Sequence, residues 1–169
     1  MVKQAAVSFV ARSGTGKTTL LEQLIPILKQ RGHRVGVIKH DAHRFEIDYP
    51  GKDSYRLSAA GADAMLLCSA EKLALVRRLT QEPPLEELLA ACGDDLDIIL
   101  TEGFKQHGLP KIELYRAALG REPLLWGGTP DPSLIAVASD VPLDLGELPV
   151  LDLNRPDQIA DFIEQRLLA

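Results

Sequence analysis

Residues Ala5–Thr19 read AAVSFVARSGTGKTT, and this stretch decides the fold of the chain. Its apolar first part is typical of a buried strand, and leucines at helical spacing follow Lys17. Between them the sequence matches the phosphate-loop pattern G-x-x-x-x-G-K-[ST], with Ala11 in place of the first glycine. A strand, a glycine-rich turn and a helix in this order indicate a site for a nucleoside triphosphate.

The glycine-rich turn has the chemistry of a phosphate site. Gly14 and Gly16 allow a tight bend that turns backbone N–H groups toward phosphate oxygens. Lys17 would reach the β- and γ-phosphates as a catalytic group, and the Thr18 hydroxyl would ligate Mg²⁺. The helix adds its positive N-terminal end. The predicted nucleotide-binding residues of this loop are Arg12, Ser13, Gly14, Thr15, Gly16, Lys17, Thr18 and Thr19.

Strand and helix patterns alternate along the chain. Strands are predicted over 3–10, 34–38, 96–101, 111–115, 134–138 and 150–153, two paired strands over 64–68 and 73–77, and helices over 17–31, 54–60, 83–92 and 159–168. This order favours an α/β fold of the P-loop NTPase type. We expect a mostly parallel central sheet flanked by helices, with an extra β-hairpin and an irregular region over 120–133. The length is most simply that of a single domain, residues 1–169.

Composition narrows the class of protein. The net charge is −5 without a basic block, which argues against a nucleic-acid-binding surface. No stretch has the length of a membrane span, and no signal-peptide pattern is seen. Cys68 and Cys92 lie far apart in apolar surroundings, which predicts two buried free thiols. These features predict a cytoplasmic protein that binds neither nucleic acid nor a membrane.

A second acidic group is expected beside a metal bound to a triphosphate. The run DIILTEG, residues 97–103, is a strongly apolar strand that places Glu102 at its carboxyl end. Ligands bind at this end of the strands in open α/β sheets. Glu102 is therefore predicted to hold Mg²⁺ together with Thr18, the alternative being a surface acid at a strand end.

The loop over residues 39–53 should also emerge near the phosphates, because it follows the second predicted strand. His40, Asp41 and His43 have loose metal-ligand spacing, but such groups in a loop are more often solvated. A segment that becomes ordered on triphosphate binding fits better. Asp41 and Asp48 are the candidates for the catalytic base that positions the attacking water, with little to separate them.

Asp140 follows the late apolar strand. An aspartate at such a place in guanine-specific folds accepts hydrogen bonds from guanine N1–H and the 2-amino group, a donor pair that adenine lacks. The usual Asn-Lys-x-Asp signal is absent, so spacing alone supports equally a loop-capping aspartate before Pro142.

Six stretches together closely resemble one family, the molybdopterin-guanine dinucleotide biosynthesis proteins B, or MobB family. The Pro-Gly-Lys-Asp-Ser and Glu-Gly-Phe-Lys segments are far more specific than the phosphate loop. The matching stretches are SGTGKTTLL at 13–21, VIKH at 37–40, DYPGKDSY at 48–55, AGA at 60–62, LTEGFK at 100–105 and IAVASD at 135–140.

The resemblance implies a GTP-binding P-loop protein that is usually dimeric and has weak GTPase activity. Such proteins assist the nucleotidyltransferase MobA, which joins GMP to molybdopterin. They act as adaptors that either deliver GTP or contact the molybdenum-insertion enzyme. Carried over by position, Glu102 and Thr18 would serve Mg²⁺ and Asp140 would face the base. The other residues that would line the nucleotide site are Pro50, Gly51, Lys52 and Asp53.

Two rival functions use the same loop. A small-molecule kinase would need an acceptor pocket and usually an arginine-rich lid, and a binding module would keep the nucleotide without turning it over. Arg12 stands where relatives that dimerise over nucleotide carry a lysine, so it would either reach a partner's phosphate or remain exposed. The remaining arginines show no compact lid pattern: Arg77, Arg78, Arg116 and Arg121 are scattered.

Overall fold

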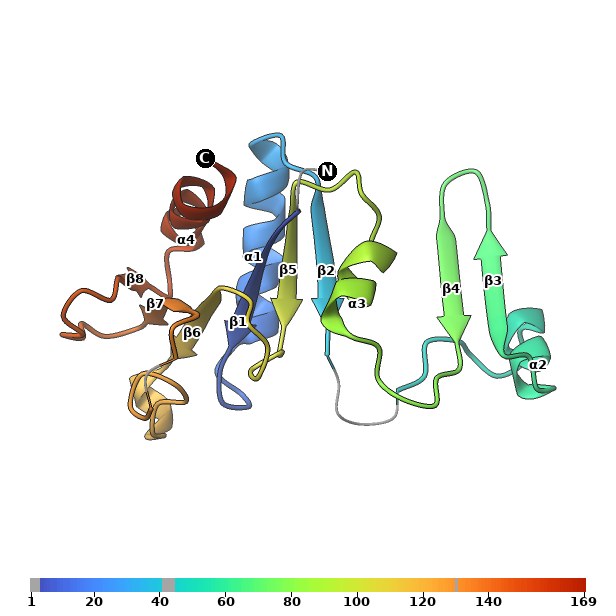
Figure 1. The fold of residues 1–169 in the computed structure, drawn as a ribbon, viewed down its shortest axis with the longest axis horizontal. Helices are drawn as coiled ribbons and strands as arrows, with labels where there is room; N and C mark the ends of the chain where they lie inside the picture. The colour runs from blue at the N-terminus through green and yellow to red at the C-terminus, as the bar shows by residue number, and fades with distance from the viewer. Residues whose placement is uncertain (1–3, 41–44, 130) are drawn as a thin grey trace. The chain divides into compact units, whose positions relative to one another are not determined.

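The computed structural model describes residues 4–40, 45–129 and 131–169. The chain divides into two compact units, one formed by the residues up to His40 and from Leu85 onward, the other by the stretch between them that ends at Pro84. Figure 1 shows the elements of both units. Compactness does not test independent folding, so the prediction of a single domain over residues 1–169 stays a prediction.

A six-stranded sheet forms the centre of the first unit. The strand order is β2-β5-β1-β6-β7-β8, and all neighbouring strands are parallel. This confirms the predicted α/β fold with a mostly parallel sheet. In that spatial order the strands are Val35–Lys39, Ile98–Glu102, Ala5–Val10, Lys111–Tyr115, Leu134–Ser139 and Val150–Asp152.

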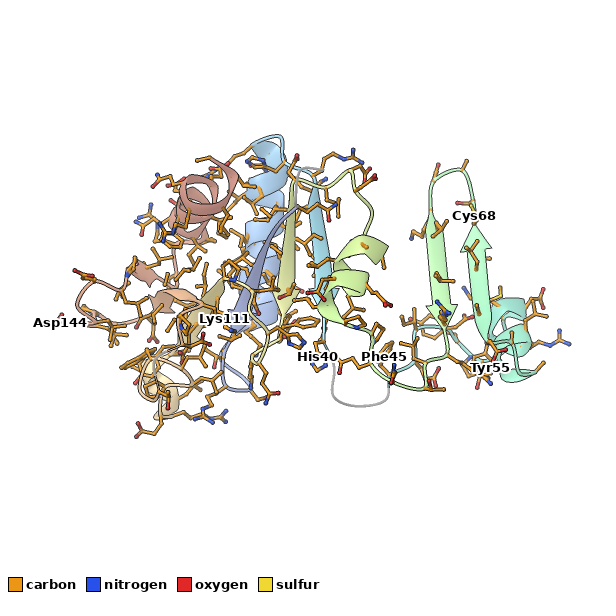
Figure 2. All side chains as sticks on the ribbon, in the orientation of Figure 1. His40, Phe45, Tyr55, Cys68, Lys111 and Asp144 are labelled. Carbon is orange, nitrogen blue, oxygen red and sulfur yellow. The ribbon has the colours of Figure 1, made fainter. Side chains whose placement is uncertain are left out.

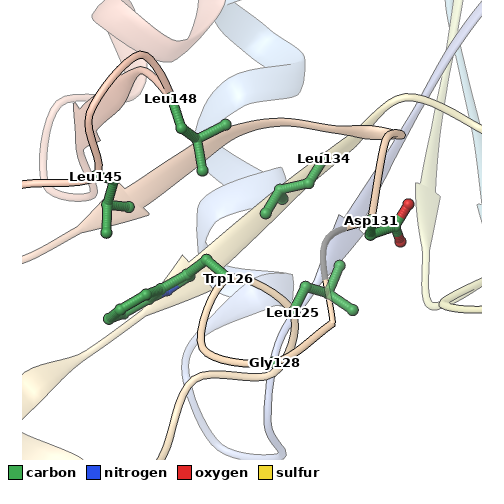
Figure 3. A pocket seen from close by; sticks show the side chains of 7 residues that line it. All are labelled: Leu125, Trp126, Gly128, Asp131, Leu134, Leu145 and Leu148. Atoms are coloured by element: carbon green, nitrogen blue, oxygen red, sulfur yellow. The ribbon is translucent and has the colours of Figure 1, made fainter.

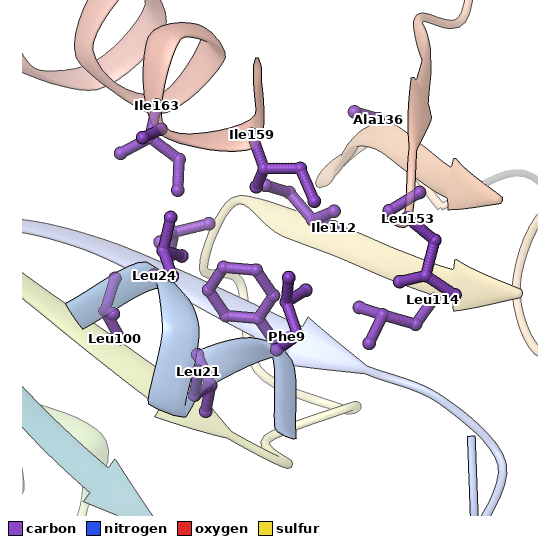
Figure 4. Close-up of a cluster of buried hydrophobic side chains, with 14 of the residues drawn as sticks. Phe9, Leu21, Leu24, Leu100, Ile112, Leu114, Ala136, Leu153, Ile159 and Ile163 are labelled. Carbon is purple, nitrogen blue, oxygen red and sulfur yellow. The ribbon is translucent and has the colours of Figure 1, made fainter. Parts of the chain in front are cut away.

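Two helices pack on one face of this sheet and on each other. They are α1 (Lys17–Gln30) and α4 (Pro156–Ile163), the latter continued by a π-helical turn, η2 (Glu164–Leu168). Their leucines and isoleucines meet alternate strand residues such as Phe9 and Ile112, because strand side chains point to opposite faces in turn (Figure 4). In the described part of the chain no helix is long and apolar enough to cross a bilayer.

The opposite face of β6 binds the irregular region through two buried charged residues. Lys111 Nζ donates to the carbonyl oxygen of His107 at 2.6 Å and to the Ser133 hydroxyl, and lies 3.1 Å from Asp131 Oδ2 (Figure 2). The Glu113 carboxylate accepts three consecutive backbone N–H groups from residues 124–126. Both buried charges are thus hydrogen-bonded, as buried charges must be, and their partners lie in or next to the irregular region.

The second unit contains a short helix and an antiparallel hairpin, as predicted. The helix α2 is Asp53–Ala59, and the hairpin strands are β3 (Ala64–Cys68) and β4 (Leu73–Arg77). Cys68 is exposed here, so the prediction that it is buried was wrong: side chains of both strands reach solvent. Cys92, in the first unit beyond α3 (Leu85–Ala91), is partly buried, and burial raises the pKa of its thiol.

Candidate nucleotide-binding site

The P-loop joins the carboxyl end of β1 to the start of α1. Gly14 and Gly16 have φ of 80° and 99°, a backbone conformation that favours glycine. The Thr15 hydroxyl donates to the carbonyl oxygen of Arg12 at 2.8 Å and closes the turn. Ala11, the departure from the phosphate-loop pattern, is buried at the end of β1. The sequence therefore forms the tight loop that the motif predicts.

Glu102 lies beside this loop. In the parallel register of β1 and β5 it pairs with Phe9, so both strands end at the same edge of the sheet. An open cavity of about 330 Å³ is lined by Glu102 together with the P-loop residues Ser13, Gly14, Gly16, Lys17, Thr18 and Thr19. Two separately predicted features thus meet in one cavity.

The proposed metal ligands, Thr18 and Glu102, lie next to each other. Thr18 Oγ1 lies 3.5 Å and 3.4 Å from the two carboxylate oxygens of Glu102. Oxygen ligands of one octahedral Mg²⁺, each about 2.0–2.1 Å from the ion, lie roughly 2.9 Å apart when adjacent and about 4.1 Å apart when opposite. The observed separations lie between these two values, so the Glu102 side chain would have to move by about half an ångström for both residues to ligate one Mg²⁺ at adjacent positions. Within the described residues no cluster of three histidine, cysteine or acidic side chains forms a metal site.

Lys17 lines the cavity and has two other lysines near it. Burial lowers the pKa of its ammonium group, Glu102 opposes that change, and neighbouring Lys105 and Lys39 add to it. Lys39 ends β2 and pairs with Glu102 in the parallel register. Sequence reasoning assigned no role to Lys39 or Lys105. They could have been predicted from their positions, because Lys39 ends β2, Lys105 follows β5, and ligands bind at the carboxyl ends of parallel strands.

The backbone is strained directly after Glu102. Gly103 has φ of 106°, and a Cβ atom there would lie 3.2 Å from His40 Cβ. Phe104 follows with φ of 53°, which is rare for an aromatic residue. The centroid of its buried ring lies 5.1 Å from that of the His40 ring and 5.2 Å from that of the His107 ring. Strain of this kind concentrates at functional sites, where surrounding packing maintains it.

Asp140 stands just beyond β7, on the side of the P-loop away from Glu102. Its Oδ1 accepts the N–H of Ala117, the first residue of the 3-10 helix η1 (Ala117–Leu119), at 2.8 Å. Its Oδ2 lies 3.7 Å from the Arg116 guanidinium. This carboxylate therefore holds the start of η1, and its described contacts do not include the loop before Pro142 that the sequence suggested it would cap. A carboxylate has about four lone-pair directions, so guanine binding by Asp140 stays a prediction.

The remaining predicted residues belong to the second unit. Asp48 accepts hydrogen bonds from the Ser54 hydroxyl and the Tyr49 N–H, and these bonds lower the pKa of its carboxyl. Lys52 is the N-cap residue of α2, and Asp53 is the first residue of the helix. Asp41 and His43 lie outside the described residues. A role for Asp48, Pro50, Gly51, Lys52 and Asp53 at the nucleotide site stays a prediction.

A second cavity of about 320 Å³ lies in the irregular region of the first unit (Figure 3). Its lining is mainly apolar and consists of Leu125, Trp126, Gly128, Asp131, Leu134, Leu145 and Leu148. Sequence reasoning did not foresee it, because these residues come from three irregular or strand-end segments without a shared pattern.

The sheet order and the loop between β1 and α1 define a protein of the P-loop NTPase type. The sequence profile of the family described as "Molybdopterin guanine dinucleotide synthesis protein B" (MobB) matches residues 6–140. The chain belongs to this family.

Relatives support this assignment along most of the chain. A protein from Escherichia coli named "Molybdopterin-guanine dinucleotide biosynthesis adapter protein" is 46% identical over 160 residues, covering 93% of this chain and 90% of that protein. The protein of the same name from Haemophilus influenzae is 43% identical, covering 92% and 85%. A crystal structure of "molybdopterin-guanine biosynthesis protein B (mobB)" matches with a TM-score of 0.72 and 29% identity, covering 96% of this chain and 99% of the other.

Proposed function

We propose that this protein is an adaptor in molybdopterin guanine dinucleotide biosynthesis that binds GTP with Mg²⁺ at its P-loop. Membership of the MobB family and the adapter name of its relatives support the pathway. The observation that carries nucleotide binding is the cavity in which the P-loop, Lys17 and Glu102 meet. Its partner is a MobA-like nucleotidyltransferase in the cytoplasm, and the molybdenum-insertion enzyme is a second candidate partner.

The roles of the side chains follow from their chemistry. The N–H groups of the loop and the start of α1 would bind phosphate oxygens, and Lys17 would neutralise charge on the β- and γ-phosphates. Thr18 and Glu102 would hold Mg²⁺, which supplies further charge neutralisation when bound. Asp140 would accept guanine donors and so select GTP over ATP.

Hydrolysis is proposed to be slow. Fast GTPases need a residue that positions water and an arginine that stabilises the developing charge. No described carboxylate besides Glu102 lines the P-loop cavity. Asp41 and Asp48 stay the proposed candidates for water positioning. Slow turnover suits an adaptor, because the nucleotide then persists while a partner performs the transfer.

Thermal shift with GTP or ATP, each with Mg²⁺, tests the nucleotide assignment. Ligand at about 100 times its Kd stabilises by about 2.7 kcal/mol, which corresponds to roughly 5–10 °C for a chain of this size. GTP should produce this shift, and Lys17→Ala should abolish it. An equal response to ATP would refute guanine selectivity, and a normal shift in Lys17→Ala would refute phosphate binding by the loop.

The hairpin of the second unit supports the proposed homodimer. Leu66 pairs with Leu75 and Cys68 with Leu73 on one face, and these leucines are 54–64% exposed. Met65 and Val76 pair on the other face. A two-stranded hairpin is only marginally stable alone, and exposed apolar surface of this kind marks an interface. We propose that a second copy of the chain covers it.

Light scattering after gel filtration tests the dimer. Leu66→Asp should lower the molecular mass to that of a monomer, because the charge would be buried at the interface. The exposed substitution Glu71→Gln, in the turn of the same hairpin, is the matched control. A pull-down of a MobA-like enzyme with and without GTP tests the adaptor role. If no MobA-like enzyme is captured either with or without GTP, the adaptor role is contradicted.

A further inference from the structure

Two arginines that follow β6 donate hydrogen bonds to carbonyl groups of the P-loop. Arg116 Nε lies 3.3 Å from the carbonyl oxygen of Thr15. A terminal guanidinium nitrogen of Arg121 lies 2.5 Å from the carbonyl oxygen of Ser13. Neither arginine lines the cavity that Lys17 and Glu102 share, so both act on the loop from outside that cavity.

Peptide geometry turns these contacts into a constraint on the loop. In a trans peptide the C=O and the following N–H point in opposite directions, and the chain has no cis bond in its described part. Holding the Thr15 carbonyl therefore directs the Gly16 N–H away from Arg116, and holding the Ser13 carbonyl directs the Gly14 N–H likewise. Among the described residues neither glycine N–H has a protein acceptor. Both glycines line the cavity.

We propose that Arg116 and Arg121 are positioning residues that hold the P-loop in its anion-binding conformation before a ligand arrives. The inference rests on the proposed function of this loop as a phosphate site. Glycine has the widest choice of backbone conformations, so a loop that depends on Gly14 and Gly16 loses the most entropy when it is ordered. Because the two arginines order the loop when the protein folds, this entropy is not lost again when the ligand binds.

Arg116 is itself held in place. Asp140 Oδ2 lies 3.7 Å from Arg116 and is only 15% exposed. In the reverse direction, the P-loop residue Arg12 donates to the carbonyl oxygens of Glu122 and Pro123, each at 3.3 Å. The P-loop and the segment after η1 therefore exchange hydrogen bonds both ways. This gives Arg12 a defined contact within its own chain.

The magnitude follows from backbone entropy. Releasing one peptide of the loop restores about 1–2 kcal/mol of conformational freedom, which binding must then remove. This corresponds to about 5- to 30-fold weaker binding for each variant. Arg121 acts on the phosphate loop through the Ser13 carbonyl, so its variant should weaken Mg-GTP and Mg-ATP binding by the same factor and leave base selectivity unchanged. Arg116 also lies 3.7 Å from Asp140, so base selectivity is judged on the Arg121 variant.

The experiment compares Arg116→Met and Arg121→Met with wild type, because methionine has a similar length and no N–H donor. Arg166→Met is the matched control, because Arg166 is an exposed arginine in η2 at the other end of the sheet. Backbone ¹⁵N order parameters are measured on the ligand-free full chain, and Mg-GTP and Mg-ATP affinities by calorimetry. We expect values near 0.85 for Gly14 and Gly16 in wild type and in the control. The Gly16 value should fall below about 0.6 in Arg116→Met, and the Gly14 value in Arg121→Met.

Each outcome decides a separate point. Order parameters that stay at wild-type values in both methionine variants would overturn the positioning role. A Gly16 order parameter that stays near 0.85 in Arg116→Lys, which keeps a donor for the Thr15 carbonyl, and falls in Arg116→Met supports it. If Arg116→Met does not fold, Arg121→Met and Arg121→Lys test the same point at Gly14. Wild type that binds neither nucleotide would refute the proposed function, while the ligand-free order parameters would still test the arginines.

Discussion

Replacing Glu113 by glutamine should loosen the irregular region that supports the P-loop. Glu113 lies on β6 and is 1% exposed. Its Oε1 accepts the Leu124 N–H at 2.5 Å, and its Oε2 accepts the N–H groups of Leu125 and Trp126 at 2.8 Å and 3.2 Å. A single carboxylate therefore anchors three consecutive residues of a segment without regular secondary structure.

Glutamine cannot reproduce this arrangement, because it has one acceptor oxygen and one NH₂ donor group. The better orientation places its carbonyl near Leu125 and Trp126 and leaves the Leu124 N–H facing a donor. One charge-assisted bond of about 1.5–3 kcal/mol is lost. The other two weaken, while the neutral side chain costs less to bury. We expect a net loss of about 2–3 kcal/mol, or roughly 4–12 °C in Tm.

Tryptophan fluorescence is a direct assay, since Trp126 is the only tryptophan of the chain. Its ring packs edge-on against Tyr115 at 5.5 Å, so its emission reports release of this segment. Urea unfolding followed by Trp126 emission should show a lower midpoint for Glu113→Gln. Glu122→Gln, an exposed substitution in the same segment, should match wild type. A Glu113→Gln stability within about 0.5 kcal/mol of wild type would refute the anchoring role.

Two further predictions concern the metal and acid stability. Glu102→Gln should weaken Mg²⁺ binding in the GTP complex by about 10- to 100-fold in a Mg²⁺ titration, and an unchanged Mg²⁺ requirement would remove Glu102 from the metal site. The hydrogen bond from Ser133, followed by the contact with Lys111, lowers the pKa of the Asp131 carboxyl in the folded chain. Because the folded pKa is depressed, this stabilisation is complete above the unfolded pKa of about 3.9 and is lost as pH falls through the folded pKa. Asp131→Asn should therefore have a lower urea midpoint than wild type at pH 7, and the difference should shrink below about pH 4. A difference independent of pH would contradict the ionic origin.

The hydrophobic patterns were sufficient to predict most elements of the fold. The apolar runs around Phe9, Leu100 and Val137 became the buried parallel strands, because a strand covered on both faces needs continuous apolar sequence. The predicted final helix, 159–168, begins earlier, at Pro156, whose fixed φ suits a first helical turn. The buried environment predicted for Cys68 was wrong, because apolar sequence alone does not show which faces of a hairpin find cover.

Part of the candidate site follows from the local sequence, and the rest depends on the tertiary structure. Gly14, Gly16, Lys17 and Thr18 form a local motif whose backbone requirements are encoded within a few residues, so the sequence by itself determined the P-loop. It also predicted Glu102 at the carboxyl end of a strand, where the structure has it. The contacts of Arg116, Arg121 and Glu113 with distant carbonyl and N–H groups depend on tertiary structure. These side chains act on residues 11 to 108 positions away, in irregular segments that have no period. Only the parallel order of β5, β1 and β6 places them beside the loop, since pairing between distant strands decides which chain ends meet at the carboxyl edge.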